Sequence, residues 1–175
     1  MLIRAEQPAE HRGVEMIHQA AFGGHAEAEV VTALRQSALF RPDWSLVAYD
    51  SGSVIAHGIF SHIGLQDPAG IVRRIVVLGP LAVLPPYQRQ GAGSALVRYG
   101  LELLDSQHEP LVIVRGELGY YGRFGFRASV MADVRAPFPV AEDHYLALAL
   151  RAYRAELRGT VRYPRAFGAV GYQTQ

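Results

Sequence analysis

The spacing of hydrophobic and polar residues divides the chain into helical and strand-like segments. Apolar residues recur at helical intervals in residues 8–21, 26–36 and 93–106, which predicts three amphipathic helices. Residues 74–84 and 111–114 are instead apolar at nearly every position, as expected for central strands covered on both faces. Helices and strands mixed in this order predict an α/β or α+β (mixed) domain built around one sheet.

Shorter patterns add further elements. Residues 2–6 predict a strand, and residues 44–49 and 54–63 predict two strands joined by a turn at Asp50-Ser51-Gly52. The remaining expected elements are a short helix over residues 117–124 and strands over residues 127–134 and 145–150. Because the chain has no repeat, low-complexity tract or flexible linker, we predict a single domain over residues 1–175.

Composition narrows the classes of function. With 50% apolar and 19% charged residues, the 175-residue chain has the composition of a globular protein. The formal net charge of +1 gives no basic excess, so no nucleic-acid partner is expected. All 17 basic residues are arginine, and the missing lysine excludes a Walker A loop, a Schiff-base enzyme and a protein kinase. The absence of cysteine excludes disulfides, thiolate metal ligands and cysteine nucleophiles.

The chain shows no targeting or membrane-spanning segment. Residues 1–10 contain several charges and few apolar residues, unlike a secretory signal. The longest uncharged apolar run, residues 75–86, is interrupted by Gly79 and Pro80, whereas a membrane-spanning helix needs about 20 residues. We therefore expect a cytoplasmic protein without a membrane partner, and a chain without cysteine suits that reducing compartment.

The segment with the clearest chemistry is the strand-to-helix turn within residues 78–96. The sequence Gln88-Arg89-Gln90-Gly91-Ala92-Gly93 opens the helix, and a helix start presents unpaired backbone N–H groups at its positive end. Gly91 and Gly93 allow an anion to approach closely, and Arg89 adds a charge-assisted contact. These residues predict a phosphate or pyrophosphate site, with an ordinary tight turn as the alternative. A dinucleotide fingerprint is excluded because residue 96 is leucine rather than glycine.

This turn resembles motif A of the GNAT acetyltransferases, in which a Gln or Arg and two small residues follow an apolar strand. Gln88, Gly91 and Gly93 occupy these places. Two later segments, YYGRFGF at residues 120–126 and GTVRYPRAFG at residues 159–168, resemble the bacterial YhbS-like branch of the family. The three segments occur in the family's order, and the resemblance extends over nearly the whole chain.

The resemblance implies a GNAT-like fold, with a central mixed, mostly antiparallel sheet flanked by helices and with strands four and five splayed apart. It also implies acetyl-CoA as the co-substrate in the gap between these strands, with no metal ion. The implied cofactor contacts are Leu81, Ala82 and Val83 for the pantetheine arm and Arg89, Gln90, Gly91, Ala92, Gly93 and Ser94 for the pyrophosphate. Pro80 has no N–H, so a bulge or a gap in strand pairing is expected there.

A catalytic acid is also implied by the resemblance. Family members often carry a tyrosine four residues before a Gly-Phe pair, and Gly125-Phe126 puts Tyr121 in that position. A proton donor suits the chemistry because attack by an amine on a thioester expels a thiolate. Tyr120 is expected to pack rather than to react. The alternative is that both tyrosines are core aromatic residues.

The carboxylate that many relatives carry on strand four or five is missing here. We predict that the amine proton leaves through water and backbone carbonyls, with Glu117 as the side-chain helper because it lies one helical turn before Tyr121. The other candidates, which are more simply explained as surface or structural residues, are Glu27, Glu29, His57 and His62. On a regular strand the two histidines would face opposite sides.

Together these features predict an acetyl-CoA-dependent N-acetyltransferase that acts on a primary amine of a small molecule or peptide, as a monomer or a homodimer. Transfer is expected to be direct, in a ternary complex, because no cysteine can carry the acetyl group. Two alternatives stay open. One is a non-catalytic acyl-CoA-binding module, which the missing carboxylate favours, and the other is a plain phosphate- or nucleotide-binding domain.

Overall fold

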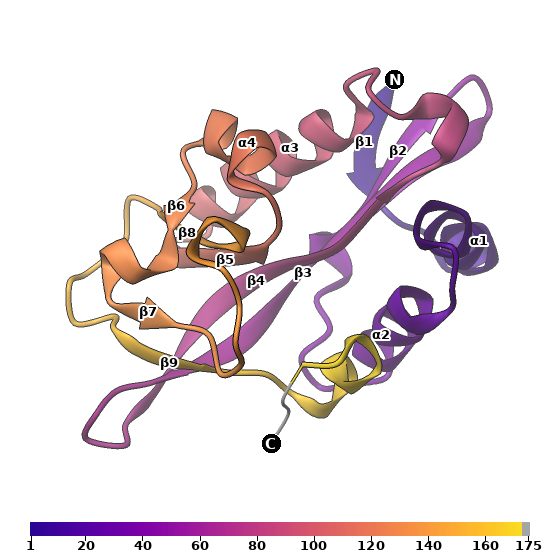
Figure 1. The fold of residues 1–175 in the computed structure, drawn as a ribbon. Helices are drawn as coiled ribbons and strands as arrows, with labels where there is room; N and C mark the ends of the chain where they lie inside the picture. The colour runs from indigo at the N-terminus through magenta and orange to yellow at the C-terminus, as the bar shows by residue number, and fades with distance from the viewer. Residues whose placement is uncertain (173–175) are drawn as a thin grey trace. The chain divides into compact units, whose positions relative to one another are not determined.

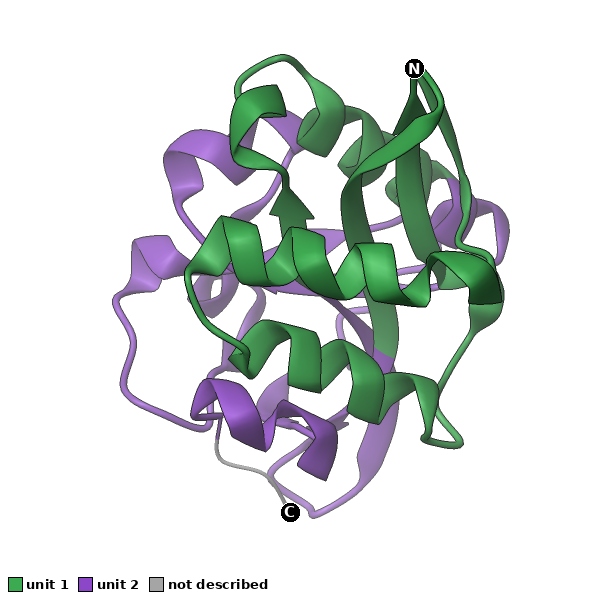
Figure 2. Ribbon diagram, turned by 90° about the vertical axis from the view of Figure 1, so that its right-hand side faces the viewer, with its two compact units in different colours: residues 1–61, 79–102 green, residues 62–78, 103–175 purple. Residues whose placement is uncertain are grey.

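The computed structural model describes residues 1–172 and divides the chain into two compact units. Unit 1 consists of Met1–Ser61 and Gly79–Glu102, and unit 2 consists of His62–Leu78 and Leu103–Gln175 (Figure 2). Each unit combines helices with hydrogen-bonded strands, and the chain has the mixed helix and strand content that the sequence pattern predicted.

The secondary structure is shown in Figure 1. The strands are β1 (Leu2–Ala5), β2 (Ser45–Asp50), β3 (Ser53–Gln66), β4 (Val72–Val83), β5 (Leu111–Arg115), β6 (Arg127–Ala128), β7 (Val134–Arg135), β8 (Tyr145–Ala149) and β9 (Gly159–Arg162). The α-helices are α1 (His11–Phe22), α2 (Ala26–Arg35), α3 (Ala92–Ser106) and α4 (Leu118–Tyr121). Strands β3 and β4 and helix α3 each run from one unit into the other.

In unit 1, helices cover both faces of an antiparallel sheet in which β1 pairs with β2 and β2 with β3. His57 of β3 contacts His18 of α1, whereas Phe60 of β3 lies against Gly100 of α3. Residues an odd number of positions apart on a strand point to opposite faces, so α1 and α3 lie on opposite faces of β3. The predicted apolar stripes of α1 and α2 are buried, and their members are Val14, Ile17, Val30, Val31 and Leu34.

Unit 2 contains the parallel pair of the sheet. Strand β4 pairs with β5 in a register that matches Val76 with Val112 and Leu78 with Val114. Strand β8 pairs antiparallel with β5 and β6, and β9 pairs antiparallel with β3 and parallel with β7. The β5 residues from Leu111 to Val114 are at most 1% exposed, as predicted for a central strand. The sheet is therefore mixed, as expected, with β4 and β5 parallel.

The prediction of one strand over residues 127–134 is wrong. Strand β6 ends at Ala128, a 3₁₀ turn occupies Ser129–Ala132, and β7 begins at Val134. Asp133 has a φ of 54°, a left-handed conformation that aspartate tolerates better than most residues. The Ser129 hydroxyl donates a hydrogen bond of 2.8 Å to the Val134 carbonyl. This local bond closes a turn where the sequence pattern suggests a continuous strand.

The C-terminal region contains structure that the sequence pattern did not predict. Strand β9 and a 3₁₀ turn at Arg165–Val170 lie in the last part of the described chain. The other predicted helices and strands are present within a few residues of their expected bounds.

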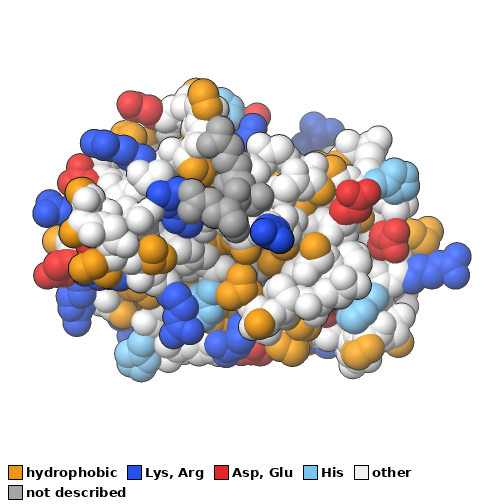
Figure 3. All heavy atoms as spheres, turned by 90° about the horizontal axis from the view of Figure 1, so that it is seen from below, with side chains coloured by type: hydrophobic (Ala, Val, Ile, Leu, Met, Phe, Trp, Pro, Cys, Tyr) orange, Lys and Arg blue, Asp and Glu red, His pale blue; other side chains and the backbone are white. Residues whose placement is uncertain are grey.

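The molecular surface mixes charges of both signs. The face shown in Figure 3 carries both arginine and acidic side chains, which agrees with the net charge of +1. Within residues 1–172, no helix is both long enough and apolar enough to cross a membrane.

Candidate functional site

The turn between β4 and α3 belongs entirely to unit 1 and is held by side-chain hydrogen bonds to its own backbone. A 3₁₀ turn begins at Pro85, at a position where a missing N–H is tolerated. The Gln88 side chain donates to the Val83 carbonyl over 3.1 Å, and the Gln90 side chain donates to the Pro86 carbonyl over 2.8 Å. These bonds tie the motif residue Gln88 to the end of β4.

The start of α3 leaves backbone donors open. The amide of Ala95 donates to the carbonyl of Gly91 over 2.9 Å and makes the first hydrogen bond of the helix. The amides of Ala92, Gly93 and Ser94 consequently donate to no carbonyl within residues 1–172. They lie at the positive end of a 15-residue helix, where an anion is stabilised. This is the arrangement that the sequence predicted for a pyrophosphate site.

Gly91 and Arg89 suit an anion at this helix start. Gly91 has a φ of 95°, and a Cβ atom built there would meet nothing within 4 Å. The backbone conformation therefore favours glycine at this position, while packing within the protein leaves the space open. The Arg89 side chain is exposed and has no hydrogen bond or ion pair to residues 1–172, so its guanidinium can contact a phosphate.

The residues expected to contact the pantetheine arm lie at the end of β4. The register between β4 and β5 ends at Leu78, so Leu81, Ala82 and Val83 lie beyond the last β4 residue that pairs with β5. Ala82 is buried, and the other two are half-buried. Pro80 precedes them and has no N–H to donate, and the pairing of β4 with β5 ends two residues before it.

Tyr121 lies in α4 of unit 2 among aromatic rings. Its ring packs edge-on against Tyr120 and Phe126, with ring centroids 4.9 and 5.7 Å apart. A Cβ atom on Gly116 would lie 2.3 Å from Cε2 of Tyr121, so only glycine there leaves room for the ring. Tyr120 is half-buried beneath the Arg123 guanidinium, which lies 4.5 Å from its ring centroid. This environment fits the expected packing of Tyr120.

The Tyr121 hydroxyl is protonated and has no hydrogen-bond partner in the described part of the chain. Burial raises the pKa of Tyr121 well above its ordinary value of 10, and the neighbouring Tyr120 and Tyr172 raise it further. The phenol therefore keeps its proton at neutral pH. Within residues 1–172 the hydroxyl has no hydrogen-bond partner, so it can donate to a bound molecule.

Glu117 is the N-cap residue of α4 and is linked to Tyr121 through the backbone. Its carbonyl accepts the amides of Tyr120 and Tyr121 over 3.0 Å each. Its side chain is exposed and forms no hydrogen bond or ion pair with residues 1–172. The carboxylate is therefore available to solvent, one helical turn from Tyr121.

The other candidate bases occupy different environments. Glu27 and Glu29 lie in the first turn of α2, and Glu29 borders a cavity of about 400 Å³ in unit 1. His62 is buried, and its Nε2 lies 2.8 Å from the Glu109 carboxylate. His57 is fully buried and also hydrogen-bonded. Within residues 1–172, no group of three or more His, Asp or Glu side chains is arranged to hold a metal ion.

His57 belongs to a buried chain of polar side chains in unit 1 that no sequence motif indicates. The carboxylate of Glu6 is bound by Arg35 through two hydrogen bonds. The Ser45 hydroxyl lies 2.8 Å from Glu6 and 2.9 Å from Nε2 of His57. Nδ1 of His57 lies 2.8 Å from Nε2 of His18. A carboxylate paired with arginine only accepts hydrogen bonds. The Ser45 hydroxyl therefore donates to Glu6, Nε2 of His57 donates to Ser45, and Nε2 of His18 donates to Nδ1 of His57.

The polar chain ends at His18, where one ring nitrogen has no hydrogen-bond partner within residues 1–172. Nδ1 of His18 is buried without a hydrogen-bond partner, and it is the only such side-chain atom within residues 1–172. Burial, with a smaller contribution from the charge of Arg35, lowers the pKa of His18 from 6.5 to about 4. Burial also lowers the pKa of His57. Both rings are therefore neutral at neutral pH, and the polar chain ends in an unprotonated acceptor.

Parallel strands β4 and β5 of a mixed sheet, joined through a helix whose glycine-rich start has open amides, agree with the expected GNAT-like fold. The chain belongs to the Acetyltransferase (GNAT) family, whose sequence profile matches residues 11–126. It is 34% identical over 146 residues to YhbS of Escherichia coli, an uncharacterized N-acetyltransferase, covering 83% of this chain and 84% of YhbS. It is 31% identical over 153 residues to YjhQ, another uncharacterized N-acetyltransferase of E. coli, covering 85% of this chain and 84% of YjhQ.

Two solved structures share the fold over nearly the whole chain. YhbS from E. coli in complex with CoA superimposes with a TM-score of 0.87 at 31% identity, covering 99% of this chain and 95% of that chain. A GNAT family acetyltransferase from Brucella melitensis in complex with acetyl-CoA superimposes with a TM-score of 0.77 at 32% identity, covering 95% and 97% of the two chains. The GNAT-like fold and the YhbS-like branch predicted from the three sequence segments are confirmed.

Proposed function

We propose that this protein transfers an acetyl group from acetyl-CoA to a primary amine of a small molecule or peptide. The observation that carries the proposal is the start of α3, where open amides, Gly91 and Arg89 offer a site for the cofactor's diphosphate. The presence of CoA or acetyl-CoA in two related structures of the same fold supports the same co-substrate here.

In this proposal, backbone groups supply most of the contacts to acetyl-CoA. The pyrophosphate binds at the amides of Arg89, Gln90, Gly91, Ala92, Gly93 and Ser94. The pantetheine arm pairs with the backbone of Leu81, Ala82 and Val83. These residues lie beyond Leu78, the last β4 residue that pairs with β5. Because both sets of contacts use the main chain, they depend on backbone conformation more than on side-chain chemistry.

The proposed transfer step needs one proton donor and one route for proton release. The neutral amine nitrogen attacks the thioester carbon, the C–S bond breaks, and the CoA thiolate takes the proton of the Tyr121 hydroxyl. Solvent then returns a proton to the tyrosinate, and the amine loses one proton through water, backbone carbonyls and Glu117. The protonated hydroxyl of Tyr121, which has no partner among the described residues, and the exposed carboxylate of Glu117 support these roles.

A second candidate function is a non-catalytic acyl-CoA-binding module. It is favoured by β4 and β5, neither of which contains a carboxylate that could take the amine proton. In such a module the same loop and strand bind acetyl-CoA, but no acetyl group is transferred.

The proposal includes the setting in which the protein acts. We take residues 1–175 as one domain that acts in the cytoplasm as a monomer or a homodimer, without a nucleic-acid or membrane partner. The cytoplasmic location rests on the cysteine-free composition. The lack of a nucleic-acid partner rests on the net charge of +1.

Release of free CoA distinguishes the two candidate functions. The purified protein is mixed with acetyl-CoA and a panel of primary amines that includes aliphatic amines, amino acids and short peptides, and free thiol is measured. Calorimetry measures acetyl-CoA binding in parallel. Amine-dependent thiol release supports the transferase, and binding without release for every amine supports the module. Absence of acetyl-CoA binding contradicts both.

Gly91→Val tests the cofactor loop. A Cβ atom at Gly91 meets nothing within 4 Å in the protein, but the new side chain would occupy the space through which the diphosphate approaches. Gly52→Val is the matched control, because Gly52 has a φ of 89° and equally open surroundings in the same unit. Loss of acetyl-CoA affinity in Gly91→Val alone supports the loop as the site. Equal affinity in the two variants contradicts it.

A further inference from the structure

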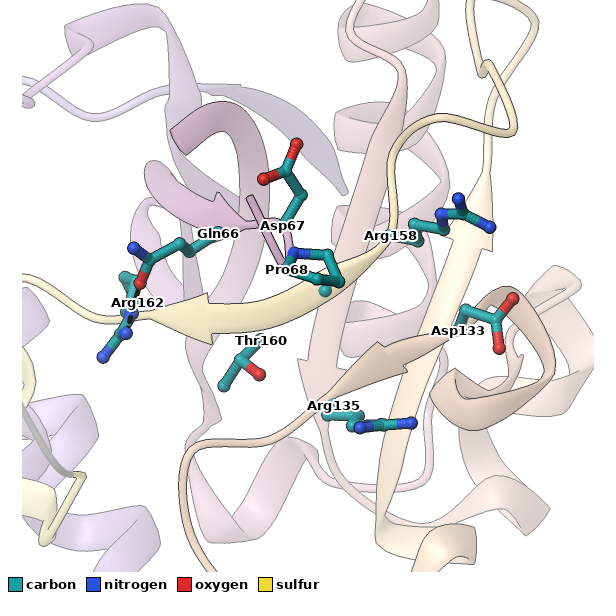
Figure 4. A pocket seen from close by; sticks show the side chains of 9 residues that line it. Gln66, Asp67, Pro68, Asp133, Arg135, Arg158, Thr160 and Arg162 are labelled. Atoms are coloured by element: carbon teal, nitrogen blue, oxygen red, sulfur yellow. Dashed lines mark hydrogen bonds between the residues drawn. The ribbon is translucent and has the colours of Figure 1, made fainter. Parts of the chain in front are cut away.

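A cavity of about 460 Å³ lies in unit 2 beside the ribbon formed by β7 and β9 (Figure 4). A cavity of this volume suits a small molecule. None of its lining residues belongs to the cofactor loop or to the aromatic group around Tyr121. The charged and hydroxyl side chains in its lining are Asp67, Asp133, Arg135, Arg158, Thr160 and Arg162.

Strand alternation brings two of these arginines to one face of the ribbon, and a third lies directly before β9. In β9, Val161 is fully buried, so Thr160 and Arg162 point to the opposite face. Arg158 precedes the strand and also lines the cavity. Arg135 of β7 is the parallel register partner of Thr160. The cavity is therefore lined by three arginines and one threonine, which come from β7, from β9 and from the residue directly before β9.

The cavity lining contains fewer carboxylates than arginines, and one of the two carboxylates is paired with an arginine outside the lining. Asp67 forms an ion pair of 2.7 Å with Arg73 and accepts two backbone amides. Asp133 is exposed and has no ion pair within residues 1–172. One uncompensated carboxylate thus faces three arginines.

The positive groups are available to a ligand. Arg135 and Arg158 are exposed and have no side-chain hydrogen bond or ion pair to residues 1–172. Arg162 donates to the side-chain carbonyl of Gln66 over 2.7 Å. Since that partner is neutral, the charge of Arg162 is not cancelled.

The two ends of the cavity differ in their groups. Figure 4 shows Arg135, Arg158 and Asp133 at one end, Arg162 and Gln66 at the other, and Thr160 between them. A ligand that spans the cavity therefore meets guanidinium groups at both ends and a hydroxyl near the middle.

We propose that this cavity binds a small molecule with two oxyanionic groups, phosphate or carboxylate, one at Arg135 and Arg158 and the other at Arg162. Guanidinium groups form paired, charge-assisted hydrogen bonds with both kinds of oxyanion. The Thr160 hydroxyl donates to a ligand oxygen, and the Asp133 carboxylate accepts from a ligand hydroxyl or ammonium group. This proposal is independent of the proposed acetyl transfer, because none of these residues has a role there.

An NMR titration tests the proposal. The probes are inorganic pyrophosphate and succinate, with chloride at matched ionic strength as the control. The titration uses protein saturated with CoA and, separately, the Gly91→Val variant, so that anions at the cofactor loop are not mistaken for this site. Saturable shifts of the β7 and β9 amides with pyrophosphate or succinate, but not with chloride, support the proposal. The probe that saturates at the lower concentration identifies phosphate or carboxylate as the preferred group.

Variants locate the binding. Arg135→Gln and Arg158→Gln should each weaken binding by roughly ten-fold. Arg127→Gln, which removes an exposed arginine of β6 in the same unit, should leave it unchanged. Circular dichroism confirms that each variant is folded. Absence of saturable shifts at β7 and β9 with both probes, or equal affinity in the wild type and the Arg135→Gln/Arg158→Gln double variant, overturns the proposal.

Discussion

Acid should destabilise the protein through the buried His18. Its pKa is about 4 in the folded protein, against 6.5 ordinarily. Because the folded-state pKa is lowered, the unfolded chain takes up the proton first as the pH falls, and stability is lost between about pH 6.5 and about pH 4. The difference between 6.5 and 4 corresponds to about 3 kcal/mol of unfolding free energy lost by pH 4. His57, whose pKa is also lowered by burial, adds to the loss in the same direction.

Urea unfolding at a series of pH values from about 8 to about 4 measures this loss. His18→Gln keeps an N–H that can donate to His57 but does not titrate, so its unfolding free energy should fall by about 3 kcal/mol less over this range. His25→Gln removes an exposed histidine of the same unit and should follow the wild type. Parallel curves for the wild type and His18→Gln would refute the reasoning.

Three further predictions concern the proposed chemistry around Tyr121. Tyr121→Phe should lower kcat by roughly 10²–10⁴-fold with little change in acetyl-CoA affinity, and Tyr120→Phe should be much milder. If steady-state kinetics show the two variants to be alike, the acid lies elsewhere. Gly116→Ala should displace the Tyr121 ring, because its Cβ would lie 2.3 Å from Cε2, and should lower stability to urea by about 1–3 kcal/mol. Gly119→Ala, whose Cβ meets nothing within 4 Å, is the control, and equal stability of the two variants would contradict the ring contact. Without a dedicated base, kcat/KM should rise with pH toward the pKa of the amine. A plateau near about pH 6–7 that Glu117→Gln removes would instead identify Glu117 as a tuned base.

Most helices and strands could be predicted because burial determines which of their positions are apolar. Leu111–Val114 is apolar throughout and forms a buried central strand. The prediction failed between Arg127 and Val134 because the hydrogen bond from Ser129 to Val134 and the left-handed Asp133 form a turn. Such bonds between side chain and backbone compete with strand pairing, and apolar periodicity does not reveal them.

Part of the candidate site could likewise be predicted from the sequence, and part could not. The cofactor loop could be predicted because its glycines and prolines are close in sequence and act on the local backbone. The polar chain, in contrast, joins Glu6, Ser45, His57 and His18 from separate segments. Only tertiary packing brings these residues together, so no spacing along the chain indicates them. The arginines beside the unit 2 cavity were missed for the same reason, because strand pairing between β7 and β9 aligns them.

The path of the chain through the two units limits how the protein can be divided. The chain changes unit at three places, between Ser61 and His62, between Leu78 and Gly79, and between Glu102 and Leu103. These places lie inside β3, β4 and α3, whereas independent domains are usually joined by exposed, flexible linkers. A truncation or proteolytic cut that separates the units must break a strand or a helix, and each unit would remain as two discontinuous pieces. Neither unit can therefore be transferred to another protein as one continuous stretch of sequence.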